Sequence, residues 1–279
     1  MRILITGGLG QLGTALQRVL SDHEVIVVDL PDVDISDRQA ISETVRDNQP
    51  EVVIHCAAYT DVDGCARNPE LAFRVNAQGT QNVALASRAV GADLIHISTN
   101  EVFAGDRPEG YEEWVRPNPI NAYGRSKTLA EYHVQSCHQK AYIVRTAWLY
   151  APGGRNFIHA ILKRAQETGQ LRVVADEIGN PTYVNDLAIA VGQLLSTGSY
   201  GIYHLVNEGA CSRWAFAQEI LRLAGLNEVR NMPILAREFR RASTPPPYGA
   251  LHNLNGAAQG IRLRPWQTAL AEYFNEHVE

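Results

Sequence analysis

The sequence predicts an α/β protein with a doubly wound parallel sheet and a smaller C-terminal lobe, and three observations support this fold class. Short apolar runs alternate with helical patterns over residues 1–150, a glycine-rich loop follows the first run, and the alternation loosens over residues 151–279. Apolar runs of this length are typical of strands buried on both faces, and their alternation with helices builds βαβ units. We therefore expect helices on both faces of one parallel sheet in the first part, with the second part beside it.

The expected elements follow one another in order along the chain. Apolar runs predict strands at residues 2–6, 24–29, 51–58, 93–99 and 141–146, and helical spacing predicts helices at residues 10–20, 37–48 and 72–91 and from residue 121 on. In the second part, a helix is expected at residues 212–225, between the loop-rich stretches 151–156 and 241–249. The strands expected at residues 171–176 and 201–207 should return to the main sheet.

Composition narrows the class of protein. The chain has 279 residues, of which 45% are hydrophobic, and this is enough for a globular core. A net charge of −5 gives no indication of a nucleic-acid or anionic-membrane partner. The four cysteines (Cys56, Cys65, Cys137 and Cys211) form no CxxC pair. We expect no metal site on spacing grounds, no signal peptide and no membrane span, and a cytoplasmic location.

A glycine-rich loop, "TGGLGQLG", lies between the first predicted strand and the first predicted helix. Gly7, Gly10 and Gly13 are spaced GxxGxxG, and Gln11 and Leu12 lie between the last two. A tight turn, close approach of the backbone to a pyrophosphate and close helix packing each leave no room for a side chain. Because the motif sits between a strand and a helix, it predicts a Rossmann-type dinucleotide-binding domain over residues 1–150; the simpler interpretation is an ordinary βα turn.

Asp29 ends the second predicted strand, where an acid can accept a hydrogen bond from the ribose 2′-hydroxyl. This position favours NADH over NADPH as the cofactor. No arginine follows directly to hold a 2′-phosphate, although Arg38 is not far along the chain. A turn aspartate without a ligand is the alternative.

Tyr123 and Lys127 are spaced to lie on one face of a helix. Residues i and i+4 are neighbours on a helix surface, so the ammonium should approach the phenol. A nearby cation stabilises phenolate and lowers the tyrosine pKa, and such a tyrosine can pass a proton to or from a substrate oxygen. We expect Lys127 to hold the cofactor ribose as well. The alternative is a chance pair with a packed tyrosine and a solvated lysine.

A hydroxyl is expected at the end of the strand at residues 93–99. Loops gather at the carboxyl edge of a parallel sheet, so Thr99 or Ser98 can reach the same point as Tyr123 and hydrogen-bond a substrate carbonyl. A hydroxyl that only caps the turn is the alternative for either residue.

Together, "TGGLGQLG", "ST" and "YGRSK" resemble the extended short-chain dehydrogenase/reductases. The blocks "VRTAWLYAPGGRNF", "VVADEIGNPTYVNDLA" and "GIYHLVNEGACSRWAFAQEI" are similar in order and spacing to the dTDP-4-dehydrorhamnose reductase family. The resemblance implies NADH- or NADPH-dependent reduction of a nucleotide-linked 4-keto-6-deoxysugar, a substrate lobe over residues 151–279, and possibilities seen in some relatives: a homodimer and Mg²⁺. It implies these site residues: Thr99, Tyr123 and Lys127 for catalysis, Ala57, Ala58 and Tyr59 at the cofactor, and Val62, Trp148 and Asn156 at the sugar, with the Trp148 ring stacked on it.

Two stretches depart from that family's pattern. Asn100 and Glu101 stand where an aspartate and a tyrosine are usual, and the related 4,6-dehydratases place Asp-Glu there as acid and base. An amide cannot act as that acid, so elimination of water is disfavoured. Pro245 and Gly249 occupy positions where an arginine and a serine are usual. Three arginines just upstream are candidates to replace the diphosphate-binding arginine: Arg237, Arg240 and Arg241.

Two other functions remain open at this point. A regulatory subunit of methionine adenosyltransferase resembles the same family and binds a dinucleotide without turning it over. An epimerase or dehydratase would instead recycle tightly held NAD. The sequence leaves the sugar, the nucleotide base and the oligomeric state undetermined.

Overall fold

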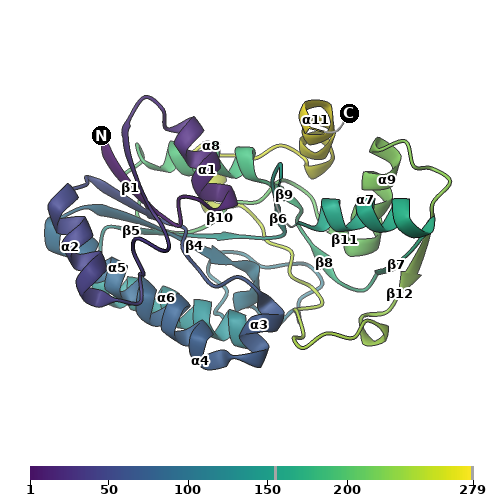
Figure 1. Ribbon diagram of the computed structural model, residues 1–279, viewed down its shortest axis with the longest axis horizontal. Helices are drawn as coiled ribbons and strands as arrows, with labels where there is room; N and C mark the ends of the chain where they lie inside the picture. Colours follow the sequence, from purple (N-terminus) through teal and green to yellow (C-terminus); the bar gives the residue numbers. More distant parts are fainter. Residues whose placement is uncertain (154–155, 278–279) are drawn as a thin grey trace.

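The core of the protein is one parallel sheet of six strands. The computed structural model describes residues 1–153 and 156–277. The strands lie in the order β10 (Gly201–His204), β5 (Ala141–Thr146), β4 (Asp93–Thr99), β3 (Val52–His55), β1 (Arg2–Thr6) and β2 (Glu24–Val28), all parallel (Figure 1). Chain order reverses at β1, since β2 lies on one side of it and β3 on the other. The predicted doubly wound parallel sheet is confirmed.

Strand alternation explains why helices cover both faces. Ile3 and Ile5 of β1 belong to one apolar cluster, whereas Leu4 between them belongs to the other. All three side chains are fully buried, because successive strand residues point to opposite faces and both faces are covered.

The helices form a layer on each face of the sheet (Figure 1). One layer, with the cluster around Leu4, consists of α2 (Arg38–Asn48), α5 (Thr80–Val90) and α6 (Ala122–Cys137). The opposite layer contains α1 (Gln11–Val19), α8 (Val184–Leu194) and α11 (Trp266–His277). Near the site lie α3 (Val62–Arg67), α4 (Pro69–Ala72), the π-helical segment η1 (Phe73–Gly79) and the 3₁₀ turn η2 (Asn100–Val102). The helix predicted at residues 72–91 is therefore present, with a π-helical start.

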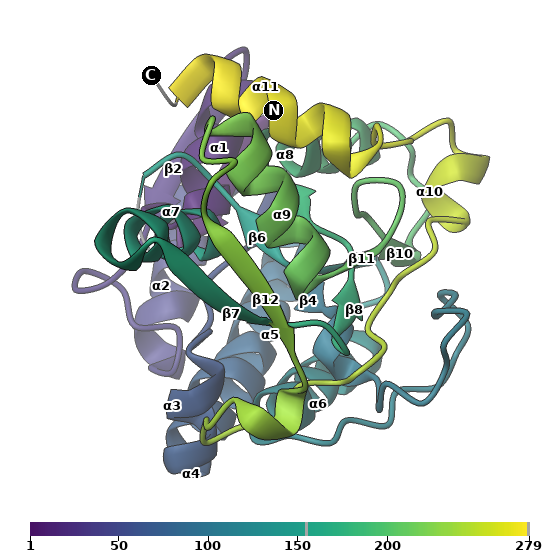
Figure 2. The same cartoon turned by 90° about the vertical axis from the view of Figure 1, so that its right-hand side faces the viewer.

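The second half of the chain does not form a fully separate lobe. Its strand β10 pairs with β5 in the main sheet, as predicted, and α8 packs against α1. The prediction for residues 171–176 is wrong: β7 (Gln170–Val174) pairs with β12 (Arg230–Ile234) away from the main sheet (Figure 2). The two strands lie 60 residues apart in register, and short-range pattern carries no information about such a partner.

The remaining strands of the second half are short. Two more two-stranded pairs are β6 (Leu149–Tyr150) with β9 (Thr182–Tyr183), and β8 (Ile178–Gly179) with β11 (Cys211–Ser212). The helical elements are α7 (Phe157–Thr168), α9 (Arg213–Leu223), η3 (Ala236–Glu238) and α10 (Asn255–Ala258). No helix among the described residues is long and apolar enough to cross a membrane.

Candidate active site

The glycine loop turns from β1 into α1 against the end of β3. Gly7 has φ +69°, and a Cβ on it would lie 2.5 Å from the Ala57 backbone nitrogen. A Cβ on Gly13 would lie 2.5 Å from the Gly7 carbonyl oxygen. Gly10 is the N-cap of α1 and offers no side chain to the first N–H groups of the helix. The cradle therefore fits a dinucleotide pyrophosphate, which needs close backbone approach and free N–H donors.

A cavity of about 850 Å³ opens at the carboxyl edge of the sheet beside this loop. It lies at the point where strand order reverses, which is the usual ligand position in open α/β sheets. All the residues that the sequence analysis assigned to the cofactor and to catalysis line it, together with two from the sugar set: Gly7, Gly10, Gln11, Leu12, Gly13, Asp29, Ala57, Ala58, Tyr59, Thr99, Tyr123, Lys127, Val62 and Trp148. Their individual roles stay predictions.

Asp29 holds the glycine loop to the end of β2. Its carboxylate accepts hydrogen bonds from the backbone N–H of Leu9 at 2.9 Å and of Leu30 at 2.8 Å. The carboxylate also faces the cavity, so it is placed both to shape the loop and to meet a ribose hydroxyl.

Tyr123 and Lys127 are both buried on α6, which begins at the N-cap Asn121. The Lys127 Nζ donates to the Ile97 carbonyl oxygen at 2.7 Å. Burial lowers the pKa of Lys127 to about 8, against the opposing effects of Glu131 and Cys56.

The predicted lowering of the tyrosine pKa is wrong for this structure. Burial and the neighbouring Glu101 raise the pKa of the Tyr123 phenol, and its hydrogen bond with Thr99 lowers it by less. The Lys127 ammonium is directed to the Ile97 carbonyl, and it does not stabilise phenolate. Tyr123 is therefore a neutral phenol at neutral pH, which is the form that donates a proton.

The structure distinguishes the two candidate hydroxyls at the end of β4. Ser98 donates to the Glu131 carboxylate at 2.5 Å, inside a buried ion pair that Glu131 forms with Arg145. Both residues line the cavity, but Thr99 is the one that acts on the Tyr123 phenol. Its hydroxyl oxygen also accepts the Glu101 N–H at 3.2 Å. Thr99 is therefore the hydroxyl that is placed to act together with Tyr123.

The sequence analysis missed Asn76, which joins both sides of the site. From η1, this fully buried side chain accepts from the Tyr59 N–H at 2.7 Å and donates to the Tyr59 carbonyl at 3.1 Å. It also donates to the Ser126 hydroxyl at 3.0 Å, between Tyr123 and Lys127 on α6. The π-helical turn that carries Asn76 is a feature often found at functional sites, but its sequence has no distinctive signal.

Arg213 is the second residue that sequence reasoning missed. It begins α9, and its guanidinium lies 3.6 Å from the centroid of the Trp148 ring. Among the described residues it has no ion-pair partner. Burial lowers its pKa to about 10, which leaves it charged at neutral pH. Because Arg213 covers one face of the indole, a sugar that stacks on that face must displace it.

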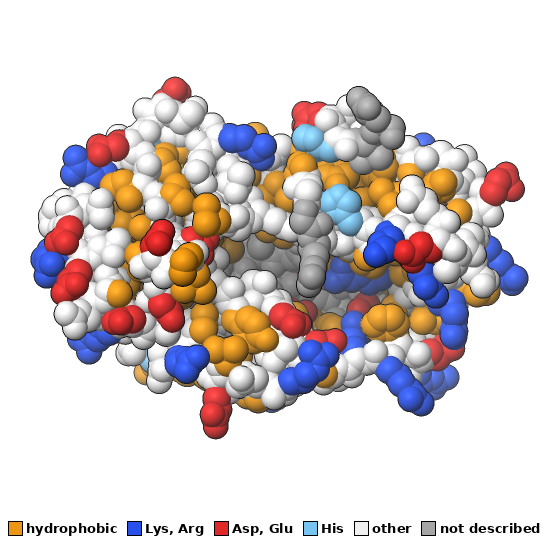
Figure 3. All heavy atoms as spheres, viewed as in Figure 1, with side chains coloured by type: hydrophobic (Ala, Val, Ile, Leu, Met, Phe, Trp, Pro, Cys, Tyr) orange, Lys and Arg blue, Asp and Glu red, His pale blue; other side chains and the backbone are white. Residues whose placement is uncertain are grey.

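A second cavity of about 940 Å³ extends into the C-terminal half from the same point. Trp148, Leu149 and Arg213 line both cavities. The face is hollowed between the two halves of the molecule, and Lys and Arg side chains gather on the C-terminal side of the hollow (Figure 3). Arg164, Arg172 and Arg241 join Arg213 in this second cavity, as does the predicted sugar-side residue Asn156. An anionic ligand suits this cavity.

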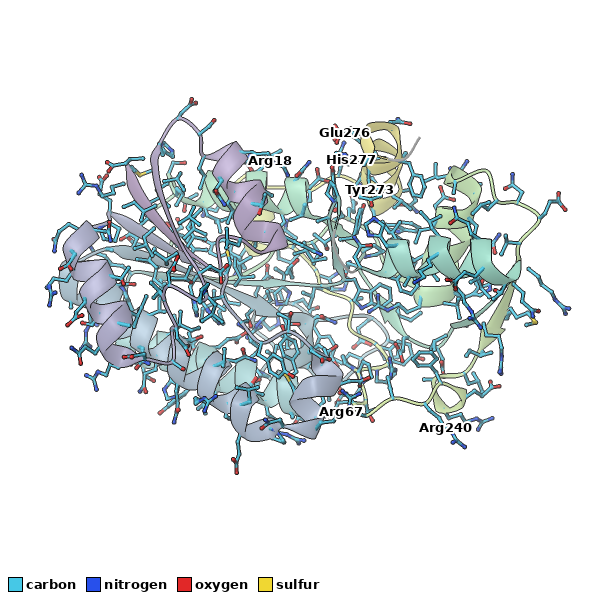
Figure 4. All side chains as sticks on the ribbon, in the orientation of Figure 1. Arg18, Arg67, Arg240, Tyr273, Glu276 and His277 are labelled. Atoms are coloured by element: carbon cyan, nitrogen blue, oxygen red, sulfur yellow. The ribbon has the colours of Figure 1, made fainter. Side chains whose placement is uncertain are left out.

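The arginines proposed from the sequence differ in position. Arg241 lines the second cavity and forms an ion pair with Glu177. Arg240 is exposed at the outer edge of the structure (Figure 4), and Arg237 is also exposed. Asn156 has structural contacts: it donates to the Ala151 carbonyl at 2.7 Å and caps α7.

Two of the departures from the family pattern contact one another. Asn100 donates to the Gly249 carbonyl at 3.2 Å, and a Cβ at Gly249 would clash with the Asn100 amide. The glycine therefore makes room for the amide, and the pair joins η2 to the C-terminal loop. Pro245, in the same loop, has no N–H and no charge to offer an anion.

Metal ligands are not grouped in the described parts of the chain. Among residues 1–153 and 156–277, no three His, Cys, Asp or Glu side chains are placed to hold a metal ion. The Mg²⁺ that the resemblance implied has no site there.

Comparison with known proteins agrees with this geometry. A family model described as "RmlD substrate binding domain" matches residues 1–279. A dTDP-4-dehydrorhamnose reductase of Mycobacterium tuberculosis is 39% identical over 279 residues, covering 97% of this chain and 91% of that one. The spore coat polysaccharide biosynthesis protein SpsK of Bacillus subtilis is 38% identical, with coverages of 99% and 97%. The crystal structure of dTDP-4-dehydrorhamnose reductase from Bacillus anthracis in complex with NADP matches with a TM-score of 0.95 and 41% identity, over 99% of both chains.

The parallel sheet, the glycine cradle and the Thr-Tyr-Lys grouping define a dinucleotide-binding protein of the extended short-chain dehydrogenase/reductase class. Within that class, the chain belongs to the dTDP-4-dehydrorhamnose reductase family. The resemblance drawn from the sequence is confirmed.

Proposed function

We propose that this protein uses NADH or NADPH to reduce a nucleotide-linked 4-keto-6-deoxysugar, and that its substrate is dTDP-4-dehydrorhamnose, reduced to dTDP-L-rhamnose. One observation supports this above the others: a single cavity holds the glycine cradle, the neutral Tyr123 phenol, Thr99 and Lys127. Relatives that bear the reductase name align over nearly the whole chain.

Thr99, Tyr123 and Lys127 have different roles in the proposed reduction. The bound dinucleotide supplies hydride to the ketone carbon. Thr99 donates a hydrogen bond to the ketone oxygen and orients it, and Tyr123 gives its proton to that oxygen as negative charge develops. Lys127 holds the ribose of the dinucleotide, and solvent reprotonates the Tyr123 phenolate that remains.

We place the sugar at the junction of the two cavities and the nucleotide in the second. Trp148 and Arg213 line both cavities, so a ligand that spans them passes these two side chains. A guanidinium that has no carboxylate partner among the described residues is suited to bind a diphosphate. On this proposal, Arg213 makes the diphosphate contact that an arginine of the C-terminal loop usually makes in this family. On this proposal, residues 151–279 form most of the substrate-binding part, while Val62 lines the first cavity and Asn156 the second.

The proposed cofactor preference follows from Asp29. A carboxylate facing the ribose site accepts a 2′-hydroxyl and repels a 2′-phosphate. We expect kcat/KM with NADH to be at least equal to that with NADPH. A strong preference for NADPH would mean that other residues read the ribose.

Turnover tests the proposal directly. Purified protein is mixed with dTDP-4-dehydrorhamnose and NADH or NADPH, and oxidation of the dinucleotide is followed by absorbance. The product should be the 4-hydroxy sugar, with one dinucleotide consumed per sugar. Tight dinucleotide binding without turnover would instead support a regulatory subunit, and conversion of the sugar without net oxidation of the dinucleotide would support an epimerase or dehydratase.

A further inference from the structure

Glu101 is an acid in the catalytic cavity to which the proposed reduction gives no role. It lies two residues after Thr99, in η2, and lines the same cavity as Tyr123 and Lys127. Its charge acts on the Tyr123 phenol, whose pKa it raises, so the carboxylate lies near the proton donor.

The carboxylate of Glu101 is held at one end only. Its Oε2 accepts a hydrogen bond from the Asn121 amide, and the same Asn121 caps the helix that carries Tyr123. A Cβ on Gly124 would clash with the Glu101 carbonyl, so the first turn of α6 packs directly on this residue. The other oxygen, Oε1, has no hydrogen-bond partner among the described residues. One oxygen thus fixes the side chain while the other is available to a ligand.

The charges around Glu101 favour a usable base. Burial raises the pKa of its carboxyl, while the hydrogen bond from Asn121 and the charges of Arg213 and Arg241 lower it by less. A carboxylate whose pKa lies nearer to working pH is a stronger base than an exposed glutamate. Arg213 and Arg241 place positive charge near the ionised carboxylate, although neither forms an ion pair with it among the described residues.

A ketone bound in this cavity has acidic hydrogens on the carbon atoms next to its carbonyl group. The hydrogens on a carbon next to a carbonyl become more acidic when the carbonyl oxygen is hydrogen-bonded, as it would be by Tyr123 and Thr99. Loss of water would require a second acid beside the leaving hydroxyl. Asn100 is an amide that donates to the Gly249 carbonyl, so it cannot supply that proton.

We propose that Glu101 removes and returns a hydrogen on the carbon next to the ketone, so that the protein catalyses enolisation of the ketosugar in addition to its reduction. The inference rests on the proposed function, since it takes the same 4-ketosugar as its substrate. The C–H electron pair forms the C=C bond, the C=O pair moves to oxygen, and oxygen takes the Tyr123 proton while Glu101 holds the carbon's proton. Reversal restores the ketone, so no electrons are gained or lost.

Exchange with heavy water tests this step apart from reduction. The protein is incubated in D₂O with dTDP-4-dehydrorhamnose and the oxidised dinucleotide, which cannot reduce the sugar. Mass spectrometry and proton NMR should show deuterium entering next to the ketone at least about 10²-fold faster than without protein. The reduction rate is measured separately with NADPH. Reduction without enzyme-dependent exchange overturns the inference alone, and absence of both overturns the proposed function as well.

The substitution Glu101→Gln separates the base from a structural role. The amide oxygen still accepts from Asn121, but the group can no longer take a proton. The ratio of exchange to reduction should fall by at least about 10²-fold. Glu70→Gln, the same change on the exposed surface of α4, should leave both rates unchanged. Equal losses of exchange and reduction in Glu101→Gln would show that Glu101 only supports Asn121 and α6, and would overturn the inference.

Discussion

Replacing Tyr123 by phenylalanine removes one oxygen from the centre of the site. The ring packs with Cys65, Ala72 and Ala122, and phenylalanine keeps these contacts, so the fold and dinucleotide binding should survive. A general acid contributes about 10²–10⁴-fold to a rate, which corresponds to about 2.7–5.4 kcal/mol of transition-state stabilisation. The phenol is neutral in the free protein and Thr99 acts on it, so Tyr123 is placed to give the alkoxide its proton.

The assay compares kcat with the Kd for NADH in the same preparation. We expect kcat for dTDP-4-dehydrorhamnose to fall by about 10²–10⁴-fold and the NADH Kd to change by less than about threefold. Tyr142→Phe is the matched control: Tyr142 is a buried tyrosine of β5 whose hydroxyl contacts Thr197, and it lies outside both cavities. A kcat close to that of the unchanged protein would refute the assignment of Tyr123 as proton donor.

Three further predictions use other parts of the site. Burial lowers the pKa of Lys127 to about 8, so its ammonium is lost as pH rises through that value and kcat/KM should fall with it; a profile that stays level across pH 8 would contradict this role. Arg213→Met keeps an apolar side chain over Trp148 but removes the positive charge. It should raise KM for the nucleotide sugar about tenfold or more and leave the NADH Kd unchanged, whereas the control Arg240→Met should change neither constant. Asn76→Ala deletes the three hydrogen bonds of a fully buried side chain, at roughly 1 kcal/mol each. Denaturant unfolding should therefore show a free energy of unfolding lower by about 3 kcal/mol, and a loss under about 1 kcal/mol would mean that water replaces the amide.

Local pattern was enough to predict most of the first half of the chain. The strands at residues 2–6, 93–99 and 141–146 match the structure residue for residue, because each is a largely apolar run short enough to be a strand. The strand predicted at residues 51–58 ends instead at His55, where the chain leaves the sheet to line the cavity. A run of small apolar residues has the same sequence pattern whether it continues a strand or borders a ligand site.

The sequence by itself determined the fold class, the glycine cradle and the pairing of Tyr123 with Lys127 on one helix, since each depends on neighbours within a few residues. Only the tertiary structure decided that Lys127 bonds to Ile97 and leaves Tyr123 neutral, and that Arg213 covers Trp148. It also brought Asn100 against Gly249, which is far from it along the chain. These contacts join segments separated by tens to more than a hundred residues. Their geometry depends on how helices and loops pack on the sheet, and periodicity along the chain carries no record of that packing.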